Sequence, residues 1–369
     1  MYHFGNFFFL HGIDFPRNDN FNYPGDANAF FLIVIFVTAL NSYGVLKLYD
    51  LLVLFKFKKV LSFYAALIFA FGTIFWGYAS TLFSHSTAAT SLILAIYFVI
   101  KGRKQDIFLS GLVSGFLATI EYASLIFVPI FLIYTALKQK NFKKIFLFGF
   151  GLSLPLVCLL LYNYIAFGNP LAFSYQYQAN FNDAASFKRP LFDGLKILLA
   201  SSWRGLFFFN PVLIFSLFGM FVMLQRDSKV FFFLVILWLG YLVLFAKYSY
   251  LEGGVSYGPR YLITTIPILI LFIAQFLSTI SLRNFNLISI PFGILLAVSV
   301  FHSFLGAYTS IFTYPESNQN PIYEITFPQF LHDIKNSFIL KLHPSLFALS
   351  FAFAFLLFLY LQLRIKSCR

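Results

Sequence analysis

The sequence contains few charged residues, because only 11% of its 369 residues are Asp, Glu, Lys or Arg, while 60% are hydrophobic. This composition excludes an ordinary soluble domain, in which about a quarter of the residues are charged. Acidic residues are the scarcer charged class, with 13 Asp and Glu against 26 Lys and Arg. Together with a mean hydropathy of +0.82, these numbers indicate a protein that passes through a membrane several times.

Cysteine is also scarce, since the chain has only Cys158 and Cys368. Cys158 falls within an apolar run and Cys368 in the C-terminal tail, so we expect different environments and no disulfide framework. The six histidines are scattered and form no His-x-x-x-His pair. No metal site is therefore predicted from a ligand motif, although a divalent metal held without such a motif stays open.

Long apolar runs fill most of the sequence. A run of about 17–25 residues crosses a bilayer as a helix, with all its backbone hydrogen bonds made internally. We therefore predict an all-α integral membrane protein, a polytopic bundle of about 11 transmembrane helices. The expected spans are residues 29–54, 60–79, 83–100, 106–120, 121–137, 145–166, 206–224, 230–246, 261–280, 287–311 and 345–363.

Lysines and arginines cluster in alternate short loops, at residues 56–59, 101–104 and 138–144. The positive-inside rule places these loops and the C-terminus in the cytoplasm. The net charge of +13 is then a result of topology, so no nucleic-acid partner is expected. The prediction is a multi-pass protein of the plasma (inner) membrane with its long loops on the non-cytoplasmic side.

The expected organisation has four parts. They are an outer N-terminal segment 1–28, a transmembrane core 29–311 with outer loops 168–205 and 247–260, an outer loop 312–344, and a last helix with cytoplasmic tail 345–369. Residues 1–28 are too polar for a signal sequence, yet the topology places them outside. We expect them to be the remnant of a first outer loop whose preceding helix is missing from this chain; the alternative is unaided translocation of a short tail.

Polar residues at the predicted outer face are functional candidates, because ionisable groups are costly at membrane depth. Arg260 follows Gly258-Pro259 and enters a helix, where its guanidinium suits a phosphate. Backbone amides of glycines also approach an anion closely. The predicted phosphate-binding residues are Arg260, Arg204, Gly253, Gly254 and Gly258. The alternative for Arg260 is a side chain that anchors the membrane edge.

Other polar residues are expected to line the same site, namely Glu252, Tyr257 and His85. His85 stands at a helix start, where histidine serves either as an interfacial hydrogen-bonding group or as a base. Glu121 separates two apolar runs. It is either a turn residue at the outer interface or a carboxylate of the site.

Several stretches, taken in order, resemble the GT-C superfamily of glycosyltransferases that use polyprenyl-phosphate sugars, among them relatives of protein O-mannosyltransferase and lipid A aminoarabinosyltransferase. They are YPG at 23–25, FGTIFWGYASTLFSHSTAA at 71–89, SGLVSGFLATIEYASLIFVP at 110–129, FGNPLAFSYQYQANF at 167–181, RGLFFFNPVLIF at 204–215 and GGVSYGPRYLITTIP at 253–267. The last stretch is the most distinctive. The resemblance covers residues 23 to about 270 and implies a GT-C type fold.

The resemblance implies an inverting hexosyl or pentosyl transferase. Its partners would be a polyprenyl-phosphate-linked sugar, membrane lipid, and a glycan, lipid or protein acceptor on the non-cytoplasmic face. Arg260 and Arg204 would stabilise the departing lipid phosphate. The family's catalytic acid lies in the first outer loop, but Asp14, Asp19 and Asp26 do not form its acidic motif.

No catalytic base is assigned by matching, so these three aspartates and Glu121 stay as candidates. Two further classes of function remain open. A transporter or flippase of lipid-linked substrates would also have many spans and basic inner loops. A non-catalytic scaffold subunit of envelope assembly would need no acidic motif.

Overall fold

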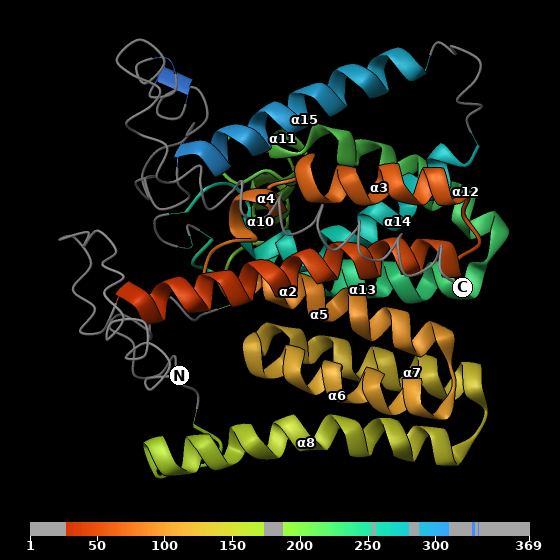
Figure 1. Cartoon of the computed structure of the whole chain (residues 1–369), viewed down its shortest axis with the longest axis vertical. Helices are drawn as coiled ribbons and strands as arrows, with labels where there is room; N and C mark the ends of the chain where they lie inside the picture. The colour runs from red at the N-terminus through yellow and green to blue at the C-terminus, as the bar shows by residue number, and fades with distance from the viewer. Residues whose placement is uncertain are drawn as a thin grey trace.

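The structure is a computed structural model. It describes residues 27–172, 187–251, 253, 256–279, 288–309, 327–328 and 331. Across this part of the chain the regular elements are helices, without any strand. The long helices lie side by side with their axes roughly aligned, and α15 lies along one edge of the view and α8 along the opposite edge (Figure 1).

The helices differ widely in length. The longest are α2 (Ala27–Leu54), α5 (Ser84–Lys101), α6 (Lys104–Ile120), α8 (Phe142–Phe167), α13 (Ser228–Lys247) and α15 (Ser289–Thr309). Shorter ones are α3 (Lys59–Phe71), α4 (Phe75–Tyr78), α7 (Phe127–Gln139), α10 (Leu191–Ala200), α11 (Leu206–Phe209), α12 (Phe215–Arg226) and α14 (Ile266–Leu277). The 3₁₀ helices η1 (Tyr122–Ile126), η3 (Pro211–Ile214) and η4 (Arg260–Thr265) continue directly into α7, α12 and α14.

Six helical segments are long and apolar enough to cross a membrane. They are Val34–Leu54, Tyr122–Gln139, Phe142–Phe167, Ser228–Lys247, Arg260–Leu277 and Ser289–Tyr308. The coarse prediction of a helical protein with membrane-spanning helices is confirmed by them. Helices also occupy the expected spans 60–79, 83–100, 106–120 and 206–224, but they are shorter or less apolar. The expected span 345–363 lies outside the described residues.

The connections between helices fall into two groups at opposite ends of the bundle. In the lysine-rich group, Nζ of Lys144 donates to the carbonyl oxygen of Gly102 at 2.7 Å. In the other group, Nη2 of Arg189 donates to the carbonyl oxygen of Ser249 at 2.6 Å, so the expected outer loops 168–205 and 247–260 meet. The alternation of loops that the basic residues predict therefore matches the arrangement of the connections.

Small residues allow α6 and α8 to pack closely. A Cβ atom on Gly111 would lie 2.0 Å from the carbonyl oxygen of Phe148, and one on Gly151 would lie 2.3 Å from that of Phe108. Glycine at such contacts lets two helix backbones approach, as is common in membrane proteins. The rest of α8 is largely uncovered, since Phe146 is 64% and Ile165 82% exposed.

Two elements differ from the sequence-based expectation. The predicted outer loop 168–205 contains helix α10, where a Cβ on Gly194 would lie 1.8 Å from the carbonyl oxygen of Ala246, so α10 packs against α13. The expected span 60–79 is interrupted, because α3 ends before Gly72. The chain then turns, and the amide of Ile74 donates to Oδ1 of Asn210 at 2.7 Å.

Candidate functional site

A buried polar cluster joins three elements at the end of the bundle away from the lysines. His85 stands in the first turn of α5, Glu121 directly follows α6, and Thr264 belongs to η4. Nδ1 of His85 lies 2.8 Å from Oε1 of Glu121, and Oγ1 of Thr264 donates to Oε2 of the same carboxylate at 2.9 Å. Glu121 is therefore both the residue that ends α6 and a buried carboxylate, 5% exposed.

The hydrogen bonds of Glu121 orient the imidazole of His85. Because a carboxylate accepts hydrogen bonds, it favours a proton on Nδ1 and leaves Nε2 as the basic nitrogen. Among the described residues nothing hydrogen-bonds to Nε2 of His85, and the ring meets that of Tyr261 edge to face, with centroids 5.5 Å apart. A histidine held in this way is suited to accept a proton.

Arg260 lies beside this cluster and opens η4. Its guanidinium carbon lies 4.9 Å from the ring centroid of Phe83 and 5.2 Å from that of Tyr261. Within the described part of the chain Arg260 forms no ion pair, and its Nε atom has no hydrogen-bond partner. Rings stabilise this cation without neutralising it, so it retains the capacity to bind an anion.

Two glycines near Arg260 have a backbone conformation that favours glycine. Gly253 and Gly258 have φ angles of +63° and +65°, a region that other residues rarely adopt. A Cβ on Gly253 would lie 2.8 Å from Nε of Arg260, so a larger residue would push the guanidinium aside. Glu252 and Gly254, predicted for the same site, lie outside the described residues.

Arg204 has a different environment from Arg260. It is only 2% exposed, and its Nη1 donates to the carbonyl oxygens of Ser256 and Gly258, the latter at 3.0 Å. Arg204 thus supports the backbone of the loop that leads into Arg260. Its predicted role as a second phosphate ligand stays a prediction.

Tyr257 lies in the packed interior. It is 1% exposed, its hydroxyl donates to the carbonyl oxygen of His302 at 2.7 Å, and its own carbonyl accepts from the hydroxyl of Tyr78 at 2.7 Å. These contacts show that Tyr257 holds the loop in place. Its role in lining the site stays a prediction.

The remaining sequence candidates are Asp14, Asp19 and Asp26, which lie outside the described residues. Sequence reasoning missed Thr264 and Tyr78. Thr264 belongs to the distinctive stretch at 253–267 and follows Arg260 by four positions, which places both in one short helical segment. Among the described residues no group of three or more His, Cys, Asp or Glu could hold a metal ion.

The fold and these contacts define a class of protein: a helical protein with membrane-spanning helices that carries, at one end, a buried histidine and carboxylate beside a partly buried arginine. Comparison with known protein families, with characterised proteins and with solved structures finds no match.

Proposed function

We propose that the protein is a membrane glycosyltransferase of GT-C type that transfers a sugar from a polyprenyl-phosphate donor to an acceptor hydroxyl on the non-cytoplasmic face. One observation carries the proposal: the rings of Phe83 and Tyr261 flank the guanidinium of Arg260 at 4.9 and 5.2 Å, and no described carboxylate pairs with it. The ring of His85, which pairs with Glu121, lies 5.5 Å from the same Tyr261 ring, between centroids.

Arg260 has the properties that departure of a lipid phosphate requires. When the bond between the sugar and the phosphate breaks, the phosphate oxygen gains negative charge. A guanidinium in a partly dry environment stabilises this charge strongly, and it can bind two oxygens at once. The buried contacts of Arg204 with the backbone of Ser256 and Gly258 would hold the loop that presents Arg260.

His85 and Glu121 supply a candidate base. The acceptor hydroxyl would attack the anomeric carbon, the bond to the phosphate oxygen would break, and the hydroxyl proton would pass to Nε2 of His85. Glu121, 2.8 Å from Nδ1, would stabilise the resulting imidazolium, as carboxylates do in other histidine-based sites. This assignment does not depend on the acidic motif that residues Asp14, Asp19 and Asp26 lack.

The arrangement of the spans supports the proposed side of the membrane. The loops that contribute Glu121, Arg204 and Arg260 lie at the end of the bundle opposite the lysine-rich loops. The positive-inside rule therefore places the site on the non-cytoplasmic face. About 11 spans, with a cytoplasmic C-terminus, remain part of this proposal.

Binding of undecaprenyl phosphate to the purified full chain in detergent tests the proposal. We expect this lipid to raise the thermal unfolding temperature of the wild type and of Lys58→Ala, because Lys58 is exposed at the opposite end. Arg260→Ala should lose the effect while unfolding at the wild-type temperature without lipid. If the lipid raises the unfolding temperature of Arg260→Ala as much as that of the wild type, Arg260 is not the phosphate ligand.

Transfer itself is tested in cells. Mass spectrometry of lipid-linked sugars and envelope glycans from deletion and parent strains should show an accumulated donor and a missing modification. If both pools are unchanged although undecaprenyl phosphate binds, transport or a scaffold role becomes the better assignment.

A further inference from the structure

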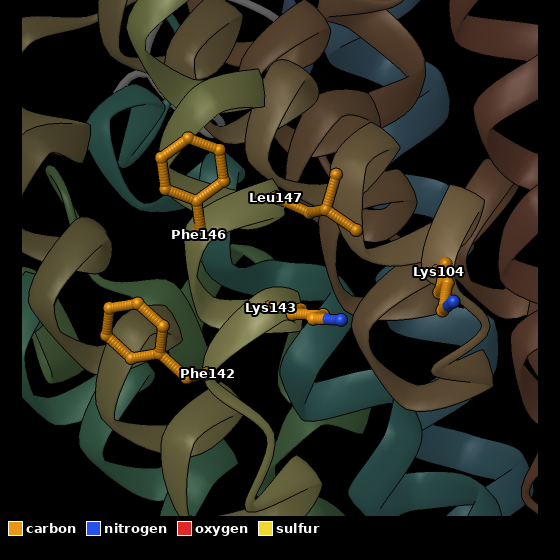
Figure 2. A pocket seen from close by; sticks show the side chains of 5 residues that line it. All are labelled: Lys104, Phe142, Lys143, Phe146 and Leu147. Atoms are coloured by element: carbon orange, nitrogen blue, oxygen red, sulfur yellow. The ribbon is translucent and has the colours of Figure 1, made fainter.

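A hollow lies at the lysine-rich end of the bundle, where α6 and α8 begin. Its volume is about 370 Å³, and it is lined by Lys104, Phe142, Lys143, Phe146 and Leu147. Figure 2 shows the side chain of Lys143 extending toward Lys104, with the rings of Phe142 and Phe146 on the other side. The wall of the hollow is almost wholly apolar, and it is formed by the side chains of two lysines together with those of two phenylalanines and a leucine.

The two lysines of the hollow are not neutralised by the described residues. The nearby carboxylate of Asp106 is already used, since it lies 2.7 Å from Nε of Arg103 and 3.6 Å from Nζ of Lys101. Within the described ranges Lys104 and Lys143 form no ion pair. The two exposed lysines beside the hollow therefore carry positive charge that no described carboxylate pairs with.

Neighbouring lysines at this end are used differently. Nζ of Lys144 donates to the carbonyl oxygen of Gly102 and to Oε1 of Gln139, both at 2.7 Å. Nζ of Lys138 donates to the carbonyl oxygen of Ile100 at 2.9 Å. These two lysines hold the connections together, which sets them apart from the pair in the hollow.

The apolar part of the hollow continues along α8. Phe142, Phe146 and Phe150 are spaced by four residues and are 80%, 64% and 51% exposed, so they form one row on a single helix face. The rings of Phe146 and Phe150 are nearly parallel, with centroids 6.5 Å apart. Because α8 is a membrane-spanning candidate, this row runs from the hollow into the bilayer.

The hollow is remote from the candidate catalytic site. Lys104 is the first residue of α6 and Glu121 directly follows its last. The helix has 17 residues, so the two are about 25 Å apart along its axis. The two places therefore lie near opposite faces of a bilayer whose apolar core is about 30 Å thick. A ligand of the hollow is thus distinct from the sugar donor.

We propose that this hollow is a binding site for an anionic phospholipid. The phosphate group binds between Lys104 and Lys143, and an acyl chain lies against Phe142, Phe146 and Phe150. Basic hollows between helices at the cytoplasmic side favour anionic headgroups, and each lysine near the surface contributes an affinity factor of about five. A zwitterionic lipid lacks the net charge to gain from both lysines.

Native mass spectrometry of the purified full chain, with phosphatidylglycerol or phosphatidylcholine of identical acyl chains, tests this site. We expect the wild type to bind phosphatidylglycerol more tightly than phosphatidylcholine. The double variant Lys104→Gln/Lys143→Gln should bind phosphatidylglycerol roughly 25-fold more weakly, from two factors of about five. The matched control Lys56→Gln/Lys58→Gln, which removes exposed lysines at the same end, should bind like the wild type.

A separate variant, Phe146→Ser, tests the apolar part of the site. Phe146→Ser should weaken binding of phosphatidylglycerol without changing the binding of inorganic phosphate. Because the substituted side chains are exposed, the unfolding temperature without lipid should stay at the wild-type value in each variant.

Three results overturn the proposal. One is unchanged binding of phosphatidylglycerol by the double variant, and another is an equal loss in the Lys56 and Lys58 control. The third is competition by millimolar inorganic phosphate as strong as that by the lipid, which would make the hollow a simple anion site. None of these results depends on whether the protein transfers sugars.

Discussion

Oε1 of Glu121 lies 2.8 Å from Nδ1 of His85, although the two residues are 36 positions apart in the sequence. This contact ties the start of α5 to the end of α6, two helices that run in opposite directions. Both side chains are buried, so water can replace their hydrogen bond only when the ends of α5 and α6 separate. The pair therefore stabilises the packing of these two helices and is also a candidate base.

Glu121→Ala should destabilise the protein. It leaves Nδ1 of His85 without its acceptor, and an unsatisfied buried group costs about 1–3 kcal/mol. Oγ1 of Thr264 also loses its shorter hydrogen bond and keeps only the carbonyl oxygen of His85 at 3.4 Å. Thermal unfolding in detergent should therefore occur at a clearly lower temperature, whereas Glu121→Gln, which retains an acceptor oxygen, should lose less. Equal unfolding temperatures for Glu121→Ala and the wild type would contradict the observed contact.

His85→Asn separates the structural role of His85 from the proposed catalytic role. The asparagine amide can still donate toward Glu121, but it offers no basic nitrogen in place of Nε2. We expect stability near that of the wild type and a loss of transfer of about 10²–10⁴-fold, the usual contribution of a general base. The conversion of lipid-linked sugar in membranes measures this. Full transfer by His85→Asn would assign the base to another residue.

Packing of α6 against α8 should be sensitive to the size of residue 151. Gly151→Val places methyl groups where even a Cβ would lie 2.3 Å from the carbonyl oxygen of Phe108, and overpacking costs about 1–3 kcal/mol. The matched control is Gly149→Val on the same helix, where a Cβ would meet nothing within 4 Å. Both variants share the same small change in helix propensity. A further fall in unfolding temperature is expected only for Gly151→Val.

Gly258→Ala should show backbone strain and a clash together. Its φ of +65° is left-handed, which costs a side chain about 1–2 kcal/mol, and a Cβ would lie 2.9 Å from Cδ1 of Phe209. Gly168→Ala isolates the first effect, since Gly168 has a φ of +69° with nothing within 4 Å of its Cβ position. The fall in unfolding temperature should be larger for Gly258→Ala, and the reverse order would show that Phe209 moves aside at no cost.

Helix positions were predictable because an apolar run must match the thickness of the bilayer core and basic residues mark the loops between runs. The predicted span 145–166 lies within α8 (Phe142–Phe167), and 230–246 lies within α13 (Ser228–Lys247). Helix α10 was missed, because its ten residues are too few for a span and its packing through Gly194 depends on α13. The interruption after α3 was missed for a related reason. It is stabilised by the hydrogen bond from the amide of Ile74 to Oδ1 of Asn210, a residue far away in the sequence.

The candidate site was predictable in part. The glycines, the Pro259 turn and Arg260 are local features, so the sequence pattern alone indicated them. The pairing of His85 with Glu121 was not predictable, because each residue alone fits a role at the membrane interface and only tertiary contact joins them. The burial of Arg204 was hidden for the same reason, since an arginine beside Trp203 is equally typical of a membrane edge.

Arg204 also constrains how the chain is assembled. Its backbone partner Ser256 follows 52 positions later, so this guanidinium stays in water or among lipid headgroups during synthesis until α13 has been inserted. The segment after Asn210 reaches its final packing later still, because the amide of Val212 donates to Oγ of Ser299 in α15 at 2.9 Å, and α15 follows α13 in the sequence. An insertion intermediate halted before residue 256 should therefore expose Arg204 to water-soluble arginine reagents that the finished protein excludes.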